Sequence, residues 1–427
     1  MRIWLTSLLV FLVYLGFHTG IALAPKDKLL APYIVCFAAA AGILLMNAEA
    51  VRFRLFLGYL MLAMALLVMA VITSQVDDNI GHHILSSGIF LYSMVIAFGT
   101  FVGLSAMGLR KASKMFFVIA ILLIAGSSME RYGGLKPVTD AARNSMDAWR
   151  QKMIYNNDLR DINLYGGVRP TFLASEPSIL GISTGYAILF WFLAGRKFTF
   201  RRISAATMMA AVGFIIVRSP TILVCWLIAC MYFASELGRS RTVPRGRTIT
   251  VGICALVTIF VTPFIVAENT AYGLTASFYE REIGPPLITA QVLSQQPLFG
   301  TGFGGSQQLI KSGKSVYAKA GGDAEGELLR ESMGDESDAK KLMASQFWEL
   351  WLDLGLVGGI LILWMLWRFF GTLSVPNRFL VFTTSALIFT MSGGLVAPGA
   401  WIGLFSIAAL YRMHHINMTA EAAEADA

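Results

Sequence analysis

Hydrophobic residues along this 427-residue chain fall into long blocks that are separated by short polar segments. A typical block contains about 20 residues, the length of an α-helix that crosses a lipid bilayer. The pattern therefore predicts an all-α polytopic membrane protein with about twelve transmembrane helices. The predicted spans are 3–23, 29–47, 55–74, 87–108, 115–129, 178–195, 203–217, 221–235, 248–267, 347–366, 379–394 and 397–411.

The apolar segment 203–235 is interpreted as two short helices rather than one long helix. Arg218, Ser219 and Pro220 occupy its centre, and proline disfavours an uninterrupted helix. A single span would also place the arginine-rich stretch 239–247 on the outer side, against the positive-inside rule. Two spans keep these arginines on the inner side.

Basic residues in the short connections predict the orientation of the chain. Alternate connections hold fifteen of them, namely Arg52, Arg54, Arg110, Lys111, Lys114, Arg196, Lys197, Arg201, Arg202, Arg239, Arg241, Arg245, Arg247, Arg368 and Arg378. The opposite short connections hold only Lys26, Lys28 and Arg218. Because lysine and arginine are enriched in cytoplasmic loops, both chain ends are predicted to be cytoplasmic. The cytoplasmic tail is 412–427, and its Ala/Glu-rich end, 420–427, is expected to be disordered.

Composition argues against a soluble enzyme and against a nucleic-acid partner. Hydrophobic residues make up 56% of the chain and charged residues 14%, whereas soluble domains contain about 25% charged residues. The net charge of +8 is explained by cytoplasmic loops that face lipid headgroups. The four cysteines lie in apolar stretches without metal-type spacing. No metal site and no cofactor are expected. Residues 1–427 are interpreted as a single integral membrane domain.

Two long segments without strong apolar character, 130–177 and 268–346, both fall on the outer side of the predicted topology. Neither has a strong strand or long-helix pattern. The function is therefore expected to lie in these two large outer loops and in the helix ends below them.

The first loop ends in a segment from Arg169 to Gly181 that runs directly into a predicted span. Ser175 or Ser178 is expected to cap that helix, and Glu176 would favour its positive end. At the membrane interface, the Glu176 carboxylate could accept a proton from a sugar hydroxyl. A helix cap with a solvated carboxylate is the alternative, and composition alone favours it.

The second loop contains a cluster of glycines, Gly300, Gly302 and Gly304, after Pro297. Glycines allow backbone N–H groups to approach a ligand closely, and consecutive amides can hold phosphate oxygens. The spacing does not match a Walker motif. A plain tight turn explains such a cluster equally well.

Arg169, Arg218 and Arg281 are distributed one to each outer connection of the central spans. Guanidinium groups suit bidentate binding of phosphate, and an interfacial arginine suggests a functional site. Anchoring to lipid headgroups is the alternative. It explains Arg218 less well, because Arg218 lies in the turn of a short apolar hairpin.

Two carboxylates, Glu349 and Asp353, lie four residues apart at the start of the predicted span 347–366 and hence on one helical face. They could orient a substrate or pair with an arginine. Alternatively, they are interfacial residues beside the aromatic belt of Trp348 and Trp351.

Taken in order, these motifs resemble those of the O-antigen ligase and polymerase superfamily of bacterial membrane glycosyltransferases. The resemblance covers roughly 165–360. It rests on the arginine-led segment with Glu176, the Arg218 turn, Arg281 followed by the Pro297–Gly304 block, and the segment with Glu349 and Asp353. In the Arg218 turn the order is Arg-Ser, whereas the family usually has Ser before Arg.

The superfamily has a membrane glycosyltransferase fold of GT-C-like type with large periplasmic loops. The resemblance implies a glycan donor on undecaprenyl pyrophosphate and an acceptor that is another lipid-linked repeat unit. It also implies a metal-independent reaction at the periplasmic face of the inner membrane, within a membrane lipid environment, alongside a chain-length regulator or an export partner. The product would be O-antigen, capsule or exopolysaccharide.

With this chemistry, Glu176, Arg218 and Arg281 are the candidate catalytic residues, and Glu176 is the general base. Fixed cations that face a leaving pyrophosphate lower the barrier to its departure. The candidate substrate-binding residues are Arg169, Gly300, Gly302, Gly304, Glu349 and Asp353.

One departure from the family pattern favours a Wzy-type polymerase over a ligase. Ala344 and Ser345 stand where ligase-type members carry a His-Asn pair, and neither large outer loop contains a histidine. An O-antigen ligase and a lipid-linked oligosaccharide flippase or transporter remain as alternatives. The paired halves typical of transporters are not found in the sequence.

Overall fold

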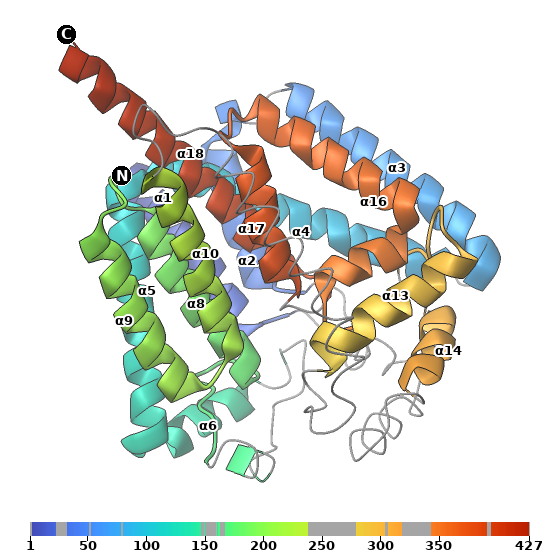
Figure 1. Ribbon diagram of the computed structural model, residues 1–427, viewed down its shortest axis with the longest axis horizontal. Coiled ribbons are helices and arrows are strands. Elements are labelled where there is room, and N and C mark those ends of the chain that lie inside the picture. Colours follow the sequence, from blue (N-terminus) through green and yellow to red (C-terminus); the bar gives the residue numbers. More distant parts are fainter. Residues whose placement is uncertain are drawn as a thin grey trace. The chain divides into compact units, whose positions relative to one another are not determined.

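The computed structural model describes residues 2–22, 32–50, 53–77, 80–146, 149, 159, 161–162, 167–237, 279–303, 306–317, 343–390 and 394–426 (Figure 1). Regular structure in these residues is helical. The helices are α1 (Arg2–Thr19), α2 (Ile34–Met46), η1 (Ala48–Ala50), α3 (Phe53–Asp77), α4 (Ile80–Met107), α5 (Leu109–Tyr132), α6 (Lys136–Ser145), α8 (Pro177–Leu193), α9 (Phe200–Val217), α10 (Pro220–Leu237), η3 (Tyr279–Ile283), α13 (Gly284–Gln295), α14 (Ser306–Tyr317), α16 (Gln346–Thr372), α17 (Arg378–Thr390) and α18 (Pro398–Asp426).

Each predicted span except 248–267, which lies outside the described residues, coincides with one helix of the structure. Six helices of the described part, α1, α3, α4, α5, α9 and α16, are long and apolar enough to cross a membrane. Four more, α2, α8, α10 and α17, are apolar but shorter. The chain is thus a helical protein of polytopic membrane type, and the total of twelve spans remains a prediction.

Two predictions about local structure are decided by the helix ends. The segment 203–235 is indeed two helices, because α9 ends at Val217 and α10 begins at Pro220. The prediction of a disordered tail is wrong for the residues up to Asp426, because α18 continues to that residue. Alanine and glutamate have high helix propensities, so the Ala/Glu-rich end extends the helix that precedes it.

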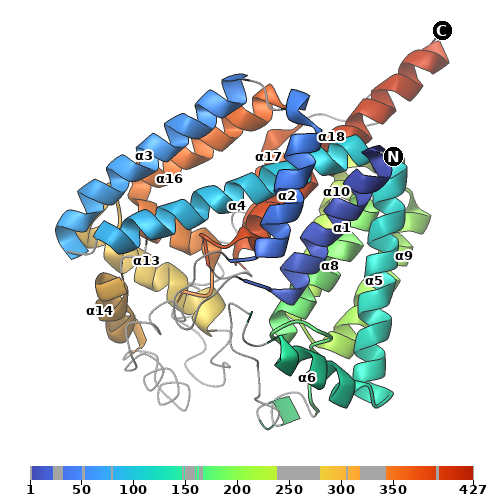
Figure 2. The same cartoon turned by 180° about the vertical axis from the view of Figure 1, so that it is seen from behind.

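The helices group into two compact units that alternate along the sequence. The first unit comprises Met1–Ala50, Met94–Thr248 and Trp401–Ala427, and the second comprises Val51–Ser93 and Ile249–Ala400. In the first unit, α8 packs against α5, α9 and α10, and α1 packs against α2 (Figure 2). In the second unit, α16 packs against α3, α13 and α17, and α14 packs against α13.

Close packing of α8 on α10 depends on two glycines four residues apart on α8. A Cβ at Gly181 would overlap Ser219, and a Cβ at Gly185 would lie 2.8 Å from the Sγ atom of Cys225. Such small residues at a helix interface allow the backbones to approach closely, which stabilises helix pairs in membranes. The turn before α10 is thereby fixed against the first turns of α8.

Candidate functional site

One end of the first unit gathers three predicted site residues, because the helices there alternate in direction. At this end α5 and α9 terminate, while α8 and α10 begin (Figure 1). Glu176 precedes α8, Arg218 lies between α9 and α10, and Arg169 lies in the segment that leads to α8. The contact of Ser219 with Gly181 places the Arg218 turn beside the start of α8.

Glu176 occupies the N-cap position of α8 with an extended backbone, φ −148° and ψ 157°. Its side chain makes no capping hydrogen bond to the helix, and Pro177 fills the first helical position. The predicted cap by Ser175 or Ser178 is therefore wrong, since Glu176 itself holds the cap position and Ser175 is buried. The half-buried Glu176 carboxylate lies at the positive end of a helix dipole, which favours its ionised form.

Arg218 has a left-handed backbone, φ 54° and ψ 46°, and its N–H donates to the Phe214 carbonyl at 2.8 Å. This conformation ends α9 and turns the chain directly into α10. The side chain is half-buried and forms no ion pair with any residue in the described part of the chain. Because none of the described carboxylates pairs with it, the Arg218 guanidinium is available to bind an anionic ligand.

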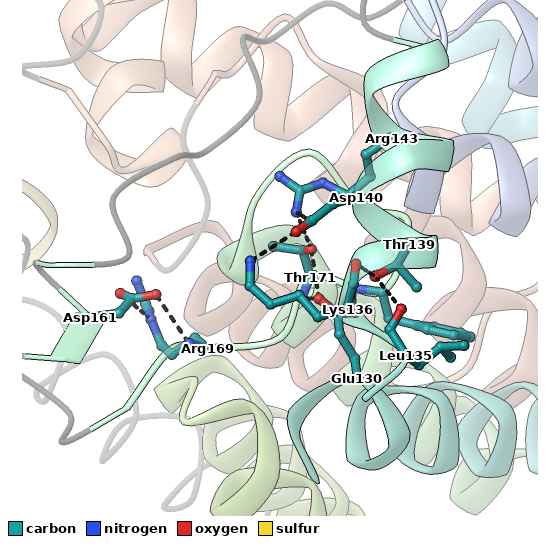
Figure 3. Close-up of polar contacts among 10 residues, drawn as sticks. Glu130, Leu135, Lys136, Thr139, Asp140, Arg143, Asp161, Arg169 and Thr171 are labelled. Carbon is teal, nitrogen blue, oxygen red and sulfur yellow. Dashed lines mark hydrogen bonds and ion pairs between the residues drawn. The ribbon is translucent and has the colours of Figure 1, made fainter. Parts of the chain in front are cut away.

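Arg169 differs from Arg218 because a buried carboxylate neutralises it. The Arg169 Nε atom lies 2.9 Å from Oδ1 of Asp161, and the Arg169 backbone N–H donates to Oδ2 of the same residue at 3.2 Å (Figure 3). The Asp161 side chain is fully buried and that of Arg169 is 15% exposed. The carboxylate orients the guanidinium, and the pair as a whole carries no net charge. Arg169 is therefore better suited to hold the chain segment around it or a sugar than to act as an isolated cation.

In the second unit, Arg281 lies on the π-helical turn η3, immediately before α13. π-helical turns are frequent at functional sites because the extra residue re-aims a side chain. The neighbouring Glu282 has a buried Oε1 atom that no described residue hydrogen-bonds. Burial raises the pKa of Glu282 from 4.5 to about 7, against the opposing effect of the Arg281 charge.

The glycine cluster forms a reciprocal contact with a break in α16. Gly355 has φ 63° and ψ −171°, which interrupts the helix and leaves the carbonyls of Leu352 and Asp353 without helical donors. The Thr301 N–H donates to the Leu352 carbonyl at 2.9 Å, and the Gly302 N–H donates to the Asp353 carbonyl at 2.8 Å. In return, the N–H groups of Leu356 and Val357 bind the carbonyls of Pro297 and Leu298.

This contact changes the interpretation of the glycines. The Gly300 N–H donates to the Gln296 carbonyl at 3.3 Å, and the Gly302 N–H is bound to α16, so both already have acceptors in the fold. In the structure both glycines serve close backbone packing, and their role as amide donors to phosphate remains a prediction. A Cβ at Gly300 would overlap the Leu352 carbonyl oxygen, and one at Gly302 would overlap Thr73. Gly304 lies outside the described residues.

Glu349 and Asp353 both lie on α16 but contact different segments. The Glu349 carboxylate accepts the backbone N–H of Leu395, in the turn before α18. Asp353 is 6% exposed, and its Oδ1 atom lies 3.5 Å from the Thr301 hydroxyl. The two carboxylates thus connect α16 to the turn at 394–397 and to the Pro297–Gly302 segment.

The predicted site residues therefore form two sets, each within one unit. Arg169, Glu176 and Arg218 belong to the first unit, and the remaining described ones belong to the second. Sequence reasoning missed Glu130, Arg131, Asp161 and Glu282. The signal for the first two was a charged pair directly after the apolar block that ends at 129. Among the described residues, no group of three or more His, Cys, Asp or Glu side chains is arranged to hold a metal ion.

Comparison with known proteins gives one family match and no match to a curated protein. The sequence model of the WcaD colanic acid polymerase family matches residues 5–413, nearly the whole chain. No curated protein matches the sequence. The family match confirms the resemblance to the O-antigen polymerase superfamily and covers both units of the structure.

Proposed function

The chain belongs to the WcaD colanic acid polymerase family, and from this premise we propose that it joins lipid-linked oligosaccharide repeat units at the periplasmic face of the inner membrane. Polymerisation of polysaccharide repeat units by a glycosyltransferase-type reaction follows from the family itself. The lipid carrier, the side of the membrane and the roles of individual residues are our proposals. The family name favours colanic acid, or a polymer of a similar repeat unit, over O-antigen or capsule.

The match over residues 5–413 is the observation that carries this function. A match to one loop would leave open a different activity built on a shared segment. A match that extends from α1 into α18 includes both sets of candidate residues and the helices that position them.

We propose that the donor is a growing glycan on undecaprenyl pyrophosphate and that the acceptor is a single lipid-linked repeat unit. A hydroxyl oxygen of the acceptor attacks the anomeric carbon of the donor, and the bond from that carbon to the pyrophosphate oxygen breaks. The hydroxyl proton passes to a carboxylate, for which Glu176 is the candidate. The pyrophosphate lipid leaves with the bonding electron pair.

Arg218 and Arg281 are proposed to stabilise the charge that develops on this pyrophosphate. Fixed cations contribute most where charge appears only in the transition state. Two features support the choice: neither arginine forms an ion pair with a described residue, and each lies directly before a helix, Arg218 in the turn before α10 and Arg281 in η3 before α13. Arg169, with its Asp161 partner, is proposed to orient the glycan, as are Glu349 and Asp353.

The location and partners follow from the same proposal. The enzyme would be a multi-pass protein of the inner membrane with cytoplasmic ends, and would act without a metal ion. A chain-length regulator or an export protein would act on its product. No nucleic-acid partner is proposed.

The test is glycan profiling of a polymerase-null strain complemented with wild type, Arg218→Ala or Arg281→Ala. Matched controls are Arg201→Ala, at the opposite end of α9 from Arg218, and Lys311→Ala, in the same outer loop as Arg281; both control residues are exposed. Membrane levels of each variant are measured by immunoblot.

Loss of long polymer in both arginine variants, with single repeat units accumulating on the outer leaflet, would support a polymerase that uses these residues. The controls should make polymer of normal length. Polymer of normal length that fails to reach its final acceptor would indicate a ligase. Repeat units retained on the inner leaflet would indicate a flippase, and either outcome would contradict the proposal.

A further inference from the structure

Two adjacent charged residues at the end of α5, Glu130 and Arg131, contact the two segments that carry Glu176 and Arg218. Neither residue belongs to the candidate site as predicted from the sequence. All four residues lie in the first unit, so their relation is fixed within one compact body.

The Glu130 carboxylate holds the segment that leads to Glu176. It is 5% exposed and accepts hydrogen bonds from the Thr171 N–H at 3.0 Å, the Thr171 hydroxyl at 3.1 Å and the Phe172 N–H at 2.6 Å (Figure 3). A buried carboxylate is stable only where donors of this kind surround it. Hydrogen bonds to an ionised group are also stronger and more directional than neutral ones.

A second charged residue supports the same contact. Arg143 of α6 is 3% exposed, and its Nη1 atom donates to the Thr171 hydroxyl at 2.6 Å and to Asp140 at 2.9 Å. The Thr171 hydroxyl therefore accepts from Arg143 and donates to Glu130. This arrangement links α5, α6 and the segment before α8 through one side chain (Figure 3).

The segment that Glu130 holds has a strained backbone. Phe172 and Leu173 have φ angles of 36° and 69°, which residues other than glycine rarely adopt. Such conformations persist only where the surroundings fix them. The Phe172 carbonyl accepts a hydrogen bond from Nε2 of His18 at 2.7 Å, and the Phe172 ring fills the space where a Cβ at Gly126 would be.

Arg131 holds the other segment. Its Nη1 atom donates to the carbonyls of Ile215 at 2.8 Å and Ile216 at 2.6 Å, in the last turn of α9. A cation at this position satisfies carbonyls that have no helical partner and interacts favourably with the helix dipole. Arg218 follows two residues after Ile216, so Arg131 fixes the turn from which the Arg218 side chain projects.

We propose that Glu130 and Arg131 are positioning residues that set the separation of Glu176 and Arg218 during glycosyl transfer; this inference rests on the proposed function. Because both belong to the last turn of one helix, a single rigid element determines where the base and the leaving-group cation lie. Catalysis is sensitive to such placement, since a displacement of about 1 Å can reduce a rate by about 10²-fold.

The experiment measures kcat and KM for polymerisation in membranes, with lipid-linked repeat units extracted from a polymerase-null strain as substrate. The variants are E130Q, E130D, R131Q and R131K. Exposed residues at other helix ends provide the controls E49Q and R110Q, the second of which is on α5 itself. Each substitution at 130 or 131 is also combined with E176Q or R218A.

We expect E130Q and R131Q to reduce kcat by at least about 10-fold while KM changes by less than about 3-fold. E130D and R131K, which retain the charge, should recover most of the rate, and the controls should match wild type. In the E176Q background, E130Q should have little further effect, because a residue that acts through another loses its influence when that residue is absent. R131Q should likewise have little effect in the R218A background.

Effects of E130Q and E176Q that multiply, or rates that fall only in proportion to the amount of protein in the membrane, would overturn the inference. If E130Q fails to accumulate, R131Q decides by the same criterion, since Arg131 is only half-buried. The proposed function fails separately: E176Q and R218A would then leave the rate unchanged, whatever the result at 130 and 131.

Discussion

The surroundings of individual arginines decide which of them remain available for an anionic substrate. Arg169 is paired with a fully buried aspartate, and Arg131 is bound to two helix carbonyls. Arg218 forms no ion pair with the residues that the structure describes. If it binds pyrophosphate oxygens, the planar fork of guanidinium should matter as well as the charge, because the fork makes two parallel hydrogen bonds.

Arg218→Lys retains the charge and removes the fork, so we expect an intermediate loss of activity. Arg218→Ala should reduce the polymerisation rate by about 10²-fold or more, which is the typical cost of removing one donor to a developing charge. Arg218→Lys should reduce it by about 10-fold. Rates are measured in membranes at equal protein levels, with Arg201→Lys as control. Equal activity of Arg218→Lys and wild type would contradict bidentate binding.

Ionisation of Glu282 makes a second prediction at the scale of one residue. Burial raises the pKa of this carboxyl to about 7 in the folded protein, from about 4.5 in the unfolded chain. Between these values the folded state binds more protons than the unfolded state, so this group lowers stability as pH rises. Glu282→Gln removes the effect, because the amide does not ionise.

We therefore expect the melting temperature of Glu282→Gln minus that of wild type to become more positive as the pH rises from 5 to 8. Most of this change should be complete just above pH 7. Thermal unfolding is measured in lipid nanodiscs at several pH values. The control is Glu49→Gln, whose side chain is 86% exposed, and its difference from wild type should vary little with pH. A difference that is constant with pH for Glu282→Gln would show that its carboxyl has an ordinary pKa.

Among the elements, α16 has a break at Gly355 that allows its backbone to bind the Pro297–Gly302 segment. Gly355 adopts φ 63°, and a Cβ there would lie 2.5 Å from the Gly300 N atom. Gly355→Ala would combine an unfavourable backbone conformation with an overlap against the Pro297–Gly302 segment. The first effect alone costs about 1–3 kcal/mol, because this combination of φ and ψ is adopted essentially only by glycine.

We expect Gly355→Ala to lower the melting temperature by several degrees and to reduce activity in parallel, since the same segment carries the motif that follows Arg281. Gly88→Ala is the matched control, because Gly88 lies within helix α4 of the same unit and a Cβ there would meet no atom within 4 Å. This control should be neutral or slightly stabilising. Loss of stability in both variants would mean that any added methyl group is harmful, and the break would need no special explanation.

Helices with a strong apolar pattern were predictable from the sequence, whereas their contacts were not. The turn at Arg218 followed from Pro220 and from the charge rule, because both depend on neighbouring residues only. The role of Gly300 and Gly302 did not follow, because the amides of Thr301 and Gly302 bind α16 carbonyls some fifty residues later in the chain and a Cβ at Gly300 would overlap the same helix. A glycine cluster has the same appearance in sequence whether it faces phosphate or another backbone.

Buried charge was the other feature that sequence reasoning could not assign. Glu130 and Arg131 follow an apolar block and resemble ordinary interfacial residues at the end of a span. Their importance depends on Thr171, Phe172, Ile215 and Ile216, which are distant in sequence and become neighbours only through the packing of α5 against α8 and α9.

For the molecule as a whole, the main prediction is its orientation in the membrane. The basic start of α9 lies beside the start of α5, because Arg202 donates to the Ser113 hydroxyl at 2.9 Å. Glu130 and Arg131 lie at the opposite end of α5 and Arg218 follows the opposite end of α9, while Glu176 precedes α8 beside the Arg218 turn. The positive-inside rule then predicts that Arg202 faces the cytoplasm and that the candidate site is on the periplasmic side.

Single cysteines in a background without Cys36, Cys225, Cys230 and Cys254 test this orientation. Val138→Cys, on the exposed surface of α6, should react with a membrane-impermeant maleimide in intact spheroplasts. Arg196→Cys, in the exposed turn between α8 and α9, should react only after permeabilisation. The reverse labelling pattern would place Glu176 and Arg218 in the cytoplasm, where the positive-inside rule and the proposed periplasmic reaction would both fail. Among the residues that the structure describes between these two positions, α8 is the apolar helix, so their opposite labelling would also support a crossing of the bilayer by this short helix.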